Sequence, residues 1–317
     1  MTATVGGEPA HRPDGLEFNP YAWRVHEDPY PLYRRLRDEA PVYRNDRLGF
    51  AALSRYDDVL AAFRDTEHLS NAEGVSLERS SQADPSATAS FLAMDPPRHD
   101  HMRGLVARGF SPRRVADLEP RIRALTAGLI DRFSARGRCD FIQDFAARLP
   151  MDVISELLGV AADDRDRLRH WADTLLHRED GVRGIPTAGV EAGRNLMRYF
   201  LDLVVARRRR PGTDLTSALV EAEIEGQRLS DGEVASFLFL MIIAGNETTT
   251  KLLGNAIYWL WRSPDARDAV RADPALVPGW IEETLRYDGS TQAMARTLTR
   301  DVGLHGETMR EGQKVLG

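Results

Sequence analysis

The sequence has one cysteine and no long apolar run, and each shortage excludes a class of protein. Cys139 stands alone among 317 residues, which excludes an internal disulfide and a metal site built from several cysteines. The longest apolar run, residues 237–245, falls far short of the roughly 20 residues that a bilayer requires. The first 15 residues are polar and lack an apolar signal core, so we expect a disordered tail over residues 1–16 and a cytoplasmic protein.

Lysine is almost absent, and the overall charge is weakly acidic. Arginine supplies 40 of the 42 basic residues, and 48 acidic residues bring the formal net charge to −6. An acidic balance gives no sign of nucleic-acid binding. Apolar residues make up 42% of the chain, which is typical of a soluble globular protein, and the length allows a large core.

Helical periodicity dominates the chain and predicts a mainly α protein with a small β-sheet. No repeat and no linker divides it, so we expect a single domain over residues 17–317. Ser230 and Glu233, three residues apart, form a capping box that predicts where the longest helix begins. The segment 66–94 has no strong period and is expected to be a long loop. Short strands are predicted over 42–44, 50–54 and within 296–317, and helices over 28–39, 56–63, 98–109, 112–134, 142–158, 162–177, 186–209, 214–223, 231–262, 264–271 and 276–287.

The stretch FLFLMIIAGNETTT, residues 237–250, places a carboxylate and three threonines directly after an apolar run. Burial of a carboxylate is costly, which suggests that this one has a use. Because a threonine hydroxyl can bond the carbonyl four residues back, Thr248 and Gly245 predict a locally widened turn with a free hydroxyl beside Glu247. Such a site can hold water and pass protons to a bound group. The alternative is a regular helix whose threonines satisfy themselves and whose Glu247 emerges at a surface.

Three segments resemble signatures of the bacterial cytochrome P450 family. AGNETT, from Ala244 to Thr249, resembles the A-G-x-[DE]-T-T signature on the helix that crosses the distal face of the haem. WIEETLRYDG resembles the E-x-x-R helix of the family, with Glu283 and Arg286 as the pair. MDPPRHDHMRGLVARGFSPRRV is the longest match and resembles the segment that begins the helix beside a haem propionate. The resemblance covers the chain from about residue 17 to residue 317.

This resemblance implies a haem-dependent monooxygenase that inserts one atom of dioxygen into a small, apolar, natural-product-like molecule. Glu247 and Thr248 would deliver protons to iron-bound oxygen, in a cavity between their helix and the helix of His99 and Arg103. The Glu283–Arg286 pair would be structural. Electrons would come from a ferredoxin and a ferredoxin reductase, and neither a membrane nor a nucleic acid would be a partner. The residues that the resemblance assigns to binding of haem b are His99, Arg103, Ala244, Gly245 and Arg296.

The iron ligand of the family is a cysteine thiolate in a loop near the C-terminus, and the sequence lacks that loop. Gly317 stands inside the expected tail sheet, so the resemblance implies a fold incomplete at its C-terminus and a chain that is inactive as written. Cys139 lies between two helices and is expected to be a buried structural thiol. The alternative is a haem-free, catalytically inactive helical protein that binds a small molecule. In the monooxygenase reading, the segments 66–94 and 172–192 are expected to shape the substrate pocket.

Overall fold

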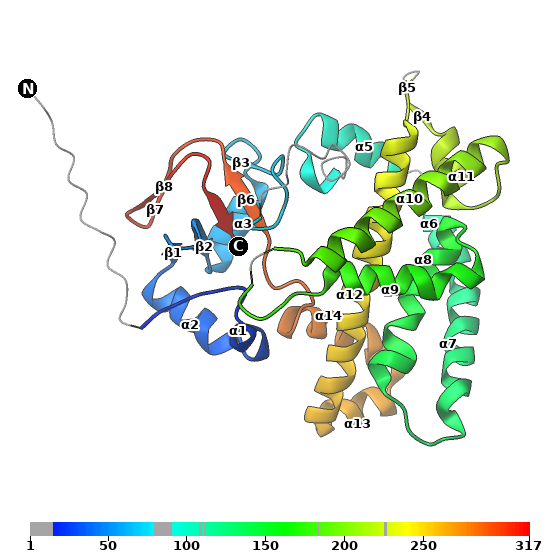
Figure 1. Ribbon diagram of the computed structural model, residues 1–317. Helices are drawn as coiled ribbons and strands as arrows, with labels where there is room; N and C mark the ends of the chain where they lie inside the picture. Colours follow the sequence, from blue (N-terminus) through cyan, green and yellow to red (C-terminus); the bar gives the residue numbers. More distant parts are fainter. Residues whose placement is uncertain (1–14, 79–90, 108–109, 111, 183, 225–226) are drawn as a thin grey trace, which may run out of the picture.

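The computed structural model describes residues 15–317 except 79–90, 108–109, 111, 183 and 225–226. A helical body lies on one side of the long helix α12 (Asp231–Arg262) and a sheet region on the other (Figure 1). The other helices are α1 Trp23–Glu27, α2 Tyr30–Glu39, α3 Tyr56–Arg64, η1 Phe91–Ala93, α5 Arg98–Ala107, α6 Pro112–Asp117, α7 Glu119–Ser134, η3 Ile142–Ala146, α8 Arg148–Leu158, η4 Ala162–Asp164, α9 Arg165–Leu176, α10 Thr187–Arg209, α11 Leu215–Glu221, α13 Pro264–Ala272, η5 Pro274–Leu276 and α14 Val277–Tyr287. The strands are β1 Val42–Asn45, β2 Phe50–Leu53, β3 Leu69–Ser70, β4 Glu223–Ile224, β5 Gln227–Arg228, β6 Ala295–Leu298, β7 Val302–Leu304, β8 Glu307–Met309 and β9 Lys314–Leu316.

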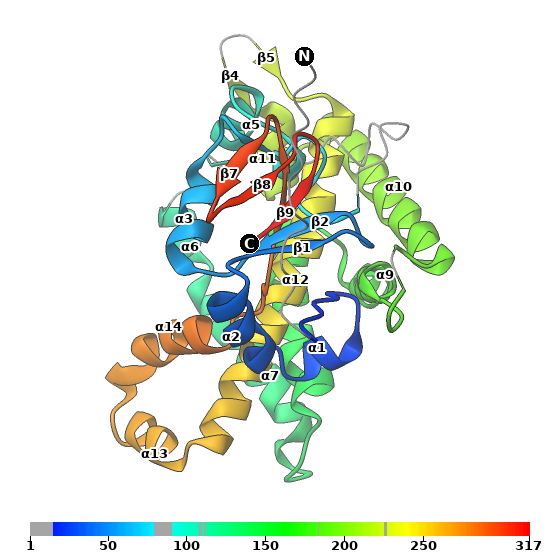
Figure 2. The same ribbon diagram turned by 90° about the vertical axis from the view of Figure 1, so that its left-hand side faces the viewer.

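Strands from both ends of the chain form one mixed sheet in the order β1-β2-β9-β6-β3. β1 and β2 pair as an antiparallel hairpin, with Val42 opposite Leu53. β9 lies parallel to β2, with Phe50 opposite Lys314, and antiparallel to β6. The last strand in sequence is therefore at the centre of the sheet, and Figure 2 shows β1, β2 and β9 in front of α12.

The core of the helical body is built around the amino-terminal half of α12. Leu238 and Ile242 lie one turn apart on this helix and are fully buried, together with Leu158 of α8 and Phe200 of α10. Full burial of each such side chain contributes about 1.5–3 kcal/mol. The capping box begins α12 as predicted, because the Ser230 hydroxyl accepts a bond from the Glu233 amide at 3.2 Å.

The predicted helices are confirmed in most places, and two local differences have physical causes. The residue limits predicted for α12 are those of the structure, but the helix is regular through residues 244–248, so the predicted widened turn is wrong. A wide π-helical turn occurs instead at Ile142–Ala146, at the start of the predicted helix 142–158. The Thr250 hydroxyl donates to the carbonyl of Ala146 at 3.1 Å and joins this turn to α12.

The predictions for the single cysteine and for the loop 66–94 also differ from the structure. Cys139 is exposed, so the expected buried thiol is wrong; it follows α7 in a connection whose residues 135–140 are all exposed. Within 66–94 the chain forms β3 and η1, and residues 79–90 lie outside the described residues. Residues 1–14 of the expected tail also lie outside them, whereas Leu16 is buried beneath the sheet.

Candidate active site

The polar turn at the centre of α12 keeps its side chains close to the helix. The Thr248 hydroxyl donates to the carbonyl of Ala244 at 2.7 Å, so the predicted back-bond forms without opening the helix. The Glu247 carboxylate lies 2.5 Å from the ammonium of Lys251, one turn later, and 34% of its side chain is exposed. Gly245 faces α8, where an added Cβ atom would lie 3.7 Å from Ile154. The acid and the hydroxyl are thus neighbours with defined partners.

A cavity of about 900 Å³ lies beside this turn, and we call it the α12 cavity. Its wall includes four residues at helical spacing on α12: Glu247, Thr248, Lys251 and Asn255. Opposite them are residues of α1 and α2 and the segments 75–78 and 290–293. Glu247 and Thr248 line this cavity, but α5, which carries His99 and Arg103, contributes nothing to its wall, so it is not the predicted cavity between α12 and α5. The regular helix, the self-bonded Thr248 and the partly exposed Glu247 match the alternative reading of this segment.

The carboxylate of Asp95 connects α5 to the sheet. It accepts a bond from the Asn71 amide at 2.7 Å and another from the Ser70 hydroxyl, and the Asp95 carbonyl accepts from the His99 amide at 3.0 Å. The His99 ring then lies edge-on to Phe91, with its Nδ1 atom 2.9 Å from Asp100. Arg103, one turn along α5, is exposed.

Arg296 of β6 is a half-buried cation. Its guanidinium lies over the ring of Phe63, 5.1 Å from the centroid. Burial lowers the pKa of Arg296, and the nearby Asp95 charge opposes this effect. Among the described residues, no carboxylate forms an ion pair or hydrogen bond with Arg296. A partly desolvated guanidinium in this condition is a suitable site for an anionic group, because the pairing would offset its burial.

The Glu283–Arg286 pair forms on α14, with 2.7 Å between Arg286 Nη2 and Glu283 Oε1. More than half of each side chain is exposed, and the paired arginine lowers the pKa of Glu283. An ion pair in such a position contributes little to stability. The expected structural role of this pair finds no support in its contacts within the described part of the chain.

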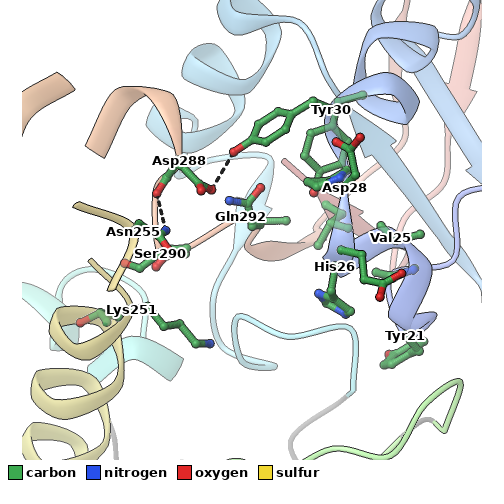
Figure 3. Close-up of a pocket in the computed structure, with 18 of the residues that line it drawn as sticks. Tyr21, Val25, His26, Asp28, Tyr30, Lys251, Asn255, Asp288, Ser290 and Gln292 are labelled. Atoms are coloured by element: carbon green, nitrogen blue, oxygen red, sulfur yellow. Dashed lines mark hydrogen bonds between the residues drawn. The ribbon is translucent and has the colours of Figure 1, made fainter. Parts of the chain in front are cut away.

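Sequence reasoning missed a connection centred on Asp288, which also lines the α12 cavity (Figure 3). One carboxylate oxygen accepts from the Tyr30 hydroxyl at 2.7 Å and the other from the Trp259 indole at 2.9 Å. The Asp288 carbonyl accepts from the side-chain amide of Asn255 at 2.7 Å. Burial, followed by the bond to Asp288, raises the pKa of Tyr30 well above its usual value. The sequence contained one indication of this connection: Asn255 and Trp259 are four residues apart and therefore lie on one face of a helix.

No helix in the described part of the chain is both long enough and apolar enough to cross a membrane. A family model described as Cytochrome P450 matches residues 203–316. The Mycobacterium tuberculosis (strain ATCC 25618 / H37Rv) protein named "Putative cytochrome P450 123" is 53% identical over 302 residues, which are 95% of this chain and 75% of that protein. The steroid C26-monooxygenase of the same strain is 39% identical over 289 residues, 90% of this chain and 70% of its own length.

The fold is also similar to solved structures. Substrate-free CYP109E1 from Bacillus megaterium superposes with a TM-score of 0.84 at 30% identity, over 92% of this chain and 76% of that one. Cytochrome P450 CYP109Q5 from Chondromyces apiculatus gives a TM-score of 0.83 at 37% identity, over 93% and 74%. The match extends through both the helical body and the sheet region.

Proposed function

The chain belongs to the cytochrome P450 family of haem-dependent monooxygenases, and on that premise we propose roles for the residues at the centre of α12 and around Arg296. Haem b supplies, when bound, the iron at which dioxygen is activated for insertion of one oxygen atom into an organic substrate. Glu247 and Thr248 carry protons in this site. Arg296, His99 and Arg103 would hold the haem carboxylates, and Ala244 and Gly245, in the turn before Thr248, would contact the cofactor.

The proton-carrying role is supported by the contacts of Glu247 and Thr248. The Glu247 carboxylate can bind a proton on the oxygen that does not contact Lys251, and it lies on the wall of a cavity that is open to solvent. The Thr248 hydrogen is engaged by the Ala244 carbonyl, while the hydroxyl oxygen remains able to accept. Rotation of this hydroxyl away from Ala244 would release its hydrogen toward the cavity. The two groups are consecutive residues that both line the cavity, so together they can hold a proton and release it there.

The half-buried cation at Arg296 is the single observation that best supports the cofactor-binding role. The propionates of haem b are carboxylates, and among the described residues no carboxylate forms an ion pair or hydrogen bond with the Arg296 guanidinium, although the Asp95 charge lies nearby. The Asp95 charge acts on Arg296 of β6, and the Asp95 backbone carbonyl accepts from the His99 amide, so Asp95 connects β6 to the start of α5. Redox partners and dioxygen are needed by this family, and we propose a ferredoxin with its reductase as the electron donors. We further propose an apolar small molecule as the substrate and the cytoplasm as the location.

Titration of the purified 317-residue chain with hemin tests this assignment. Arg296→Met is expected to weaken hemin binding about tenfold or more, because it removes a charge-assisted contact. Arg300→Met is the matched control: Arg300 follows the same strand but pairs with Glu67 at the surface, so its loss should leave the affinity unchanged. Hemin dimethyl ester has no free propionate for Arg296 to pair with, so it should bind the Arg296 and Arg300 variants equally.

Equal hemin affinity of the wild-type chain and the Arg296 variant would contradict the assignment, and absence of hemin uptake would favour a haem-free binding protein. Cys139→Ala provides a separate check on the iron ligand. Because the connection after α7 lies at the end of the helical body, away from the centre of α12 (Figure 1), this variant should leave the Soret band of the loaded chain unchanged.

A further inference from the structure

The carboxylate of Asp288 is held by neutral donors. Tyr30 and Trp259 each donate one hydrogen bond to it, and among the described residues no lysine, arginine or histidine forms an ion pair with it. Each carboxylate oxygen retains a second lone pair. Asp288 is only partly buried and Tyr30 is exposed, so a ligand in the α12 cavity can reach this carboxylate. The negative charge at this position is available for a cation that the described chain does not supply.

Aromatic rings lie beside the same carboxylate. Tyr30 stacks on Tyr287 with 6.5 Å between ring centroids, and Tyr287 meets Trp259 edge-on at 4.8 Å. Tyr258 packs edge-on against Trp259 at 5.1 Å and also lines the cavity. A cation placed against the faces of tyrosine and tryptophan is attracted by their electron density, which is how proteins bind organic ammonium groups. An acid within an aromatic cluster favours an organic ammonium over a small hydrated metal ion.

The charges on the cavity wall agree with a cationic ligand. Its carboxylates are those of Glu27, Asp28, Glu78, Glu247 and Asp288. Among the described residues of the wall, Lys251 is the one lysine or arginine, and Figure 3 shows this side chain extending from α12 into the cavity. The Lys251 ammonium is 2.5 Å from Glu247, so the two charges largely cancel. His26, on α1, is the remaining titratable base of the wall.

The position of Asp288 relative to Thr248 sets the length of the ligand. Asn255, whose side chain binds the Asp288 carbonyl, lies seven residues after Thr248 on α12. Seven residues are two turns, so these residues share a helix face and are about 10 Å apart along the axis. We propose that the α12 cavity binds a protonated organic amine, with its ammonium at Asp288 and its apolar body extending along α12 toward Thr248. This inference rests on the function proposed above, because Thr248 marks the reacting end.

Binding of a probe series to the full 317-residue chain without haem tests the inference. The probes are 4-phenylbutylamine, 4-phenylbutan-1-ol and 4-phenylbutanoate, which share an apolar body and differ in the charge of one end. The chain is used before hemin is added, because an amine can also bind haem iron. Isothermal titration calorimetry is expected to show the amine binding at least about tenfold more tightly than the alcohol, with the acid weakest.

Two aspartate variants test whether Asp288 is the source of the preference for the amine over the alcohol. Asp288→Asn keeps the shape but removes the charge, and the ratio of amine to alcohol affinity should fall to about one. Asp28→Asn is the matched control, because it removes a charge from an exposed part of the same wall and should change the ratio less than about threefold. If Asp288→Asn does not fold, Tyr30→Leu, which removes the ring and its hydroxyl, should lower amine affinity several-fold while sparing the alcohol.

Equal wild-type affinities for amine and alcohol would overturn the inference, and so would equal losses of amine preference in Asp28→Asn and Asp288→Asn. Different results would contradict the proposed function and the proposed ammonium site. Amine preference without hemin uptake would contradict the proposed function alone. Hemin uptake that depends on Arg296, in a chain without amine preference, would contradict the ammonium site alone.

Discussion

The two halves of α12 contain similar apolar side chains but have different surroundings. In the amino-terminal half, Phe237, Leu238 and Ile242 are buried in the core of the helical body. In the carboxyl-terminal half, Ile257 is 42% exposed and Trp261 is 65% exposed. The first half stabilises the protein, whereas the second presents the polar residues that line the α12 cavity. Apolar composition alone therefore does not distinguish a buried segment from a surface one.

The largest predicted difference between the halves is in core packing. Leu238→Ala should lower the free energy of unfolding by about 3–5 kcal/mol, because it leaves a cavity where the side chain is fully buried. Ile257→Ala, in the exposed half, should lower it by less than about 1 kcal/mol. Urea denaturation measures both values. Similar losses in the two variants would show that the halves do not differ in the way their exposure indicates.

The second-largest difference is expected between the stabilising effects of the glutamates beside the two halves of α12. Glu156 lies on α8, beside the buried half, and accepts bonds from Arg121 at 2.6 Å and Arg165 at 3.1 Å. The bond from Arg121 is the main cause that lowers the pKa of Glu156 in the folded state. The Glu156 carboxylate therefore binds a proton more readily in the unfolded chain than in the folded one. The stabilisation from ionised Glu156 is thus present above about pH 5 and is lost as the pH falls through the lowered pKa of the folded state.

Glu156→Gln should accordingly lower the free energy of unfolding at pH 7 by about 1–2 kcal/mol and reduce its dependence on acid pH. The matched control is Glu283→Gln on α14, which contacts the exposed half. Its pKa is also lowered by an arginine, but the pair is solvated, so the urea midpoint should not change. Urea midpoints between pH 4 and pH 7 provide the test, and an equal response of both variants would be incompatible with it.

A smaller effect is expected at the two ends of α12. Ser230→Ala removes the capping hydroxyl at the amino terminus and should lower the free energy of unfolding by about 1 kcal/mol. Ser263, the residue that ends α12, makes no side-chain capping bond to the following helix, so Ser263→Ala is the control with no expected change. Thermal unfolding followed by circular dichroism distinguishes the two. A neutral Ser230 variant would mean that tertiary packing alone fixes where α12 begins.

The smallest effect, of opposite sign, is expected where the two halves meet. Asn246 is buried, and its Oδ1 atom has no hydrogen-bond partner among the described residues. Asn246→Leu removes this unsatisfied oxygen with the same number and branching of side-chain heavy atoms and should leave the protein as stable or more stable by up to about 1 kcal/mol. A clear destabilisation, measured by urea denaturation, would show that the amide has a partner such as a buried water.

Local signals explain what the sequence predicted well. The limits of α12 followed from Ser230, Glu233 and a continuous apolar pattern, all of which act within a few residues. The back-bond from Thr248 to Ala244 was likewise a prediction from spacing, although the helix absorbs it without widening. Family resemblance led to the fold and to haem. The roles of Glu247 and Arg296 remain predictions that their contacts support.

Long-range contacts account for what the sequence did not predict. Tyr30 and Asp288 are separated by 258 residues, and no local pattern indicates that they pair. The parallel pairing of β2 with β9 is equally remote. Cys139 and the Glu283–Arg286 pair show the other difficulty, since their exposure depends on which elements pack nearby, and a side chain's own type does not report this.

The central position of β9 has a consequence for how the chain is made. During synthesis the β1–β2 hairpin leaves the ribosome about 260 residues before its neighbour β9 is available, whereas the segments of the helical core emerge in between. The helical body can condense first, and the hairpin must wait with one edge of β2 unpaired. That interval is when the nascent protein is most open to strand exchange with other chains, and it ends only when residues 314–316 insert between β2 and β6.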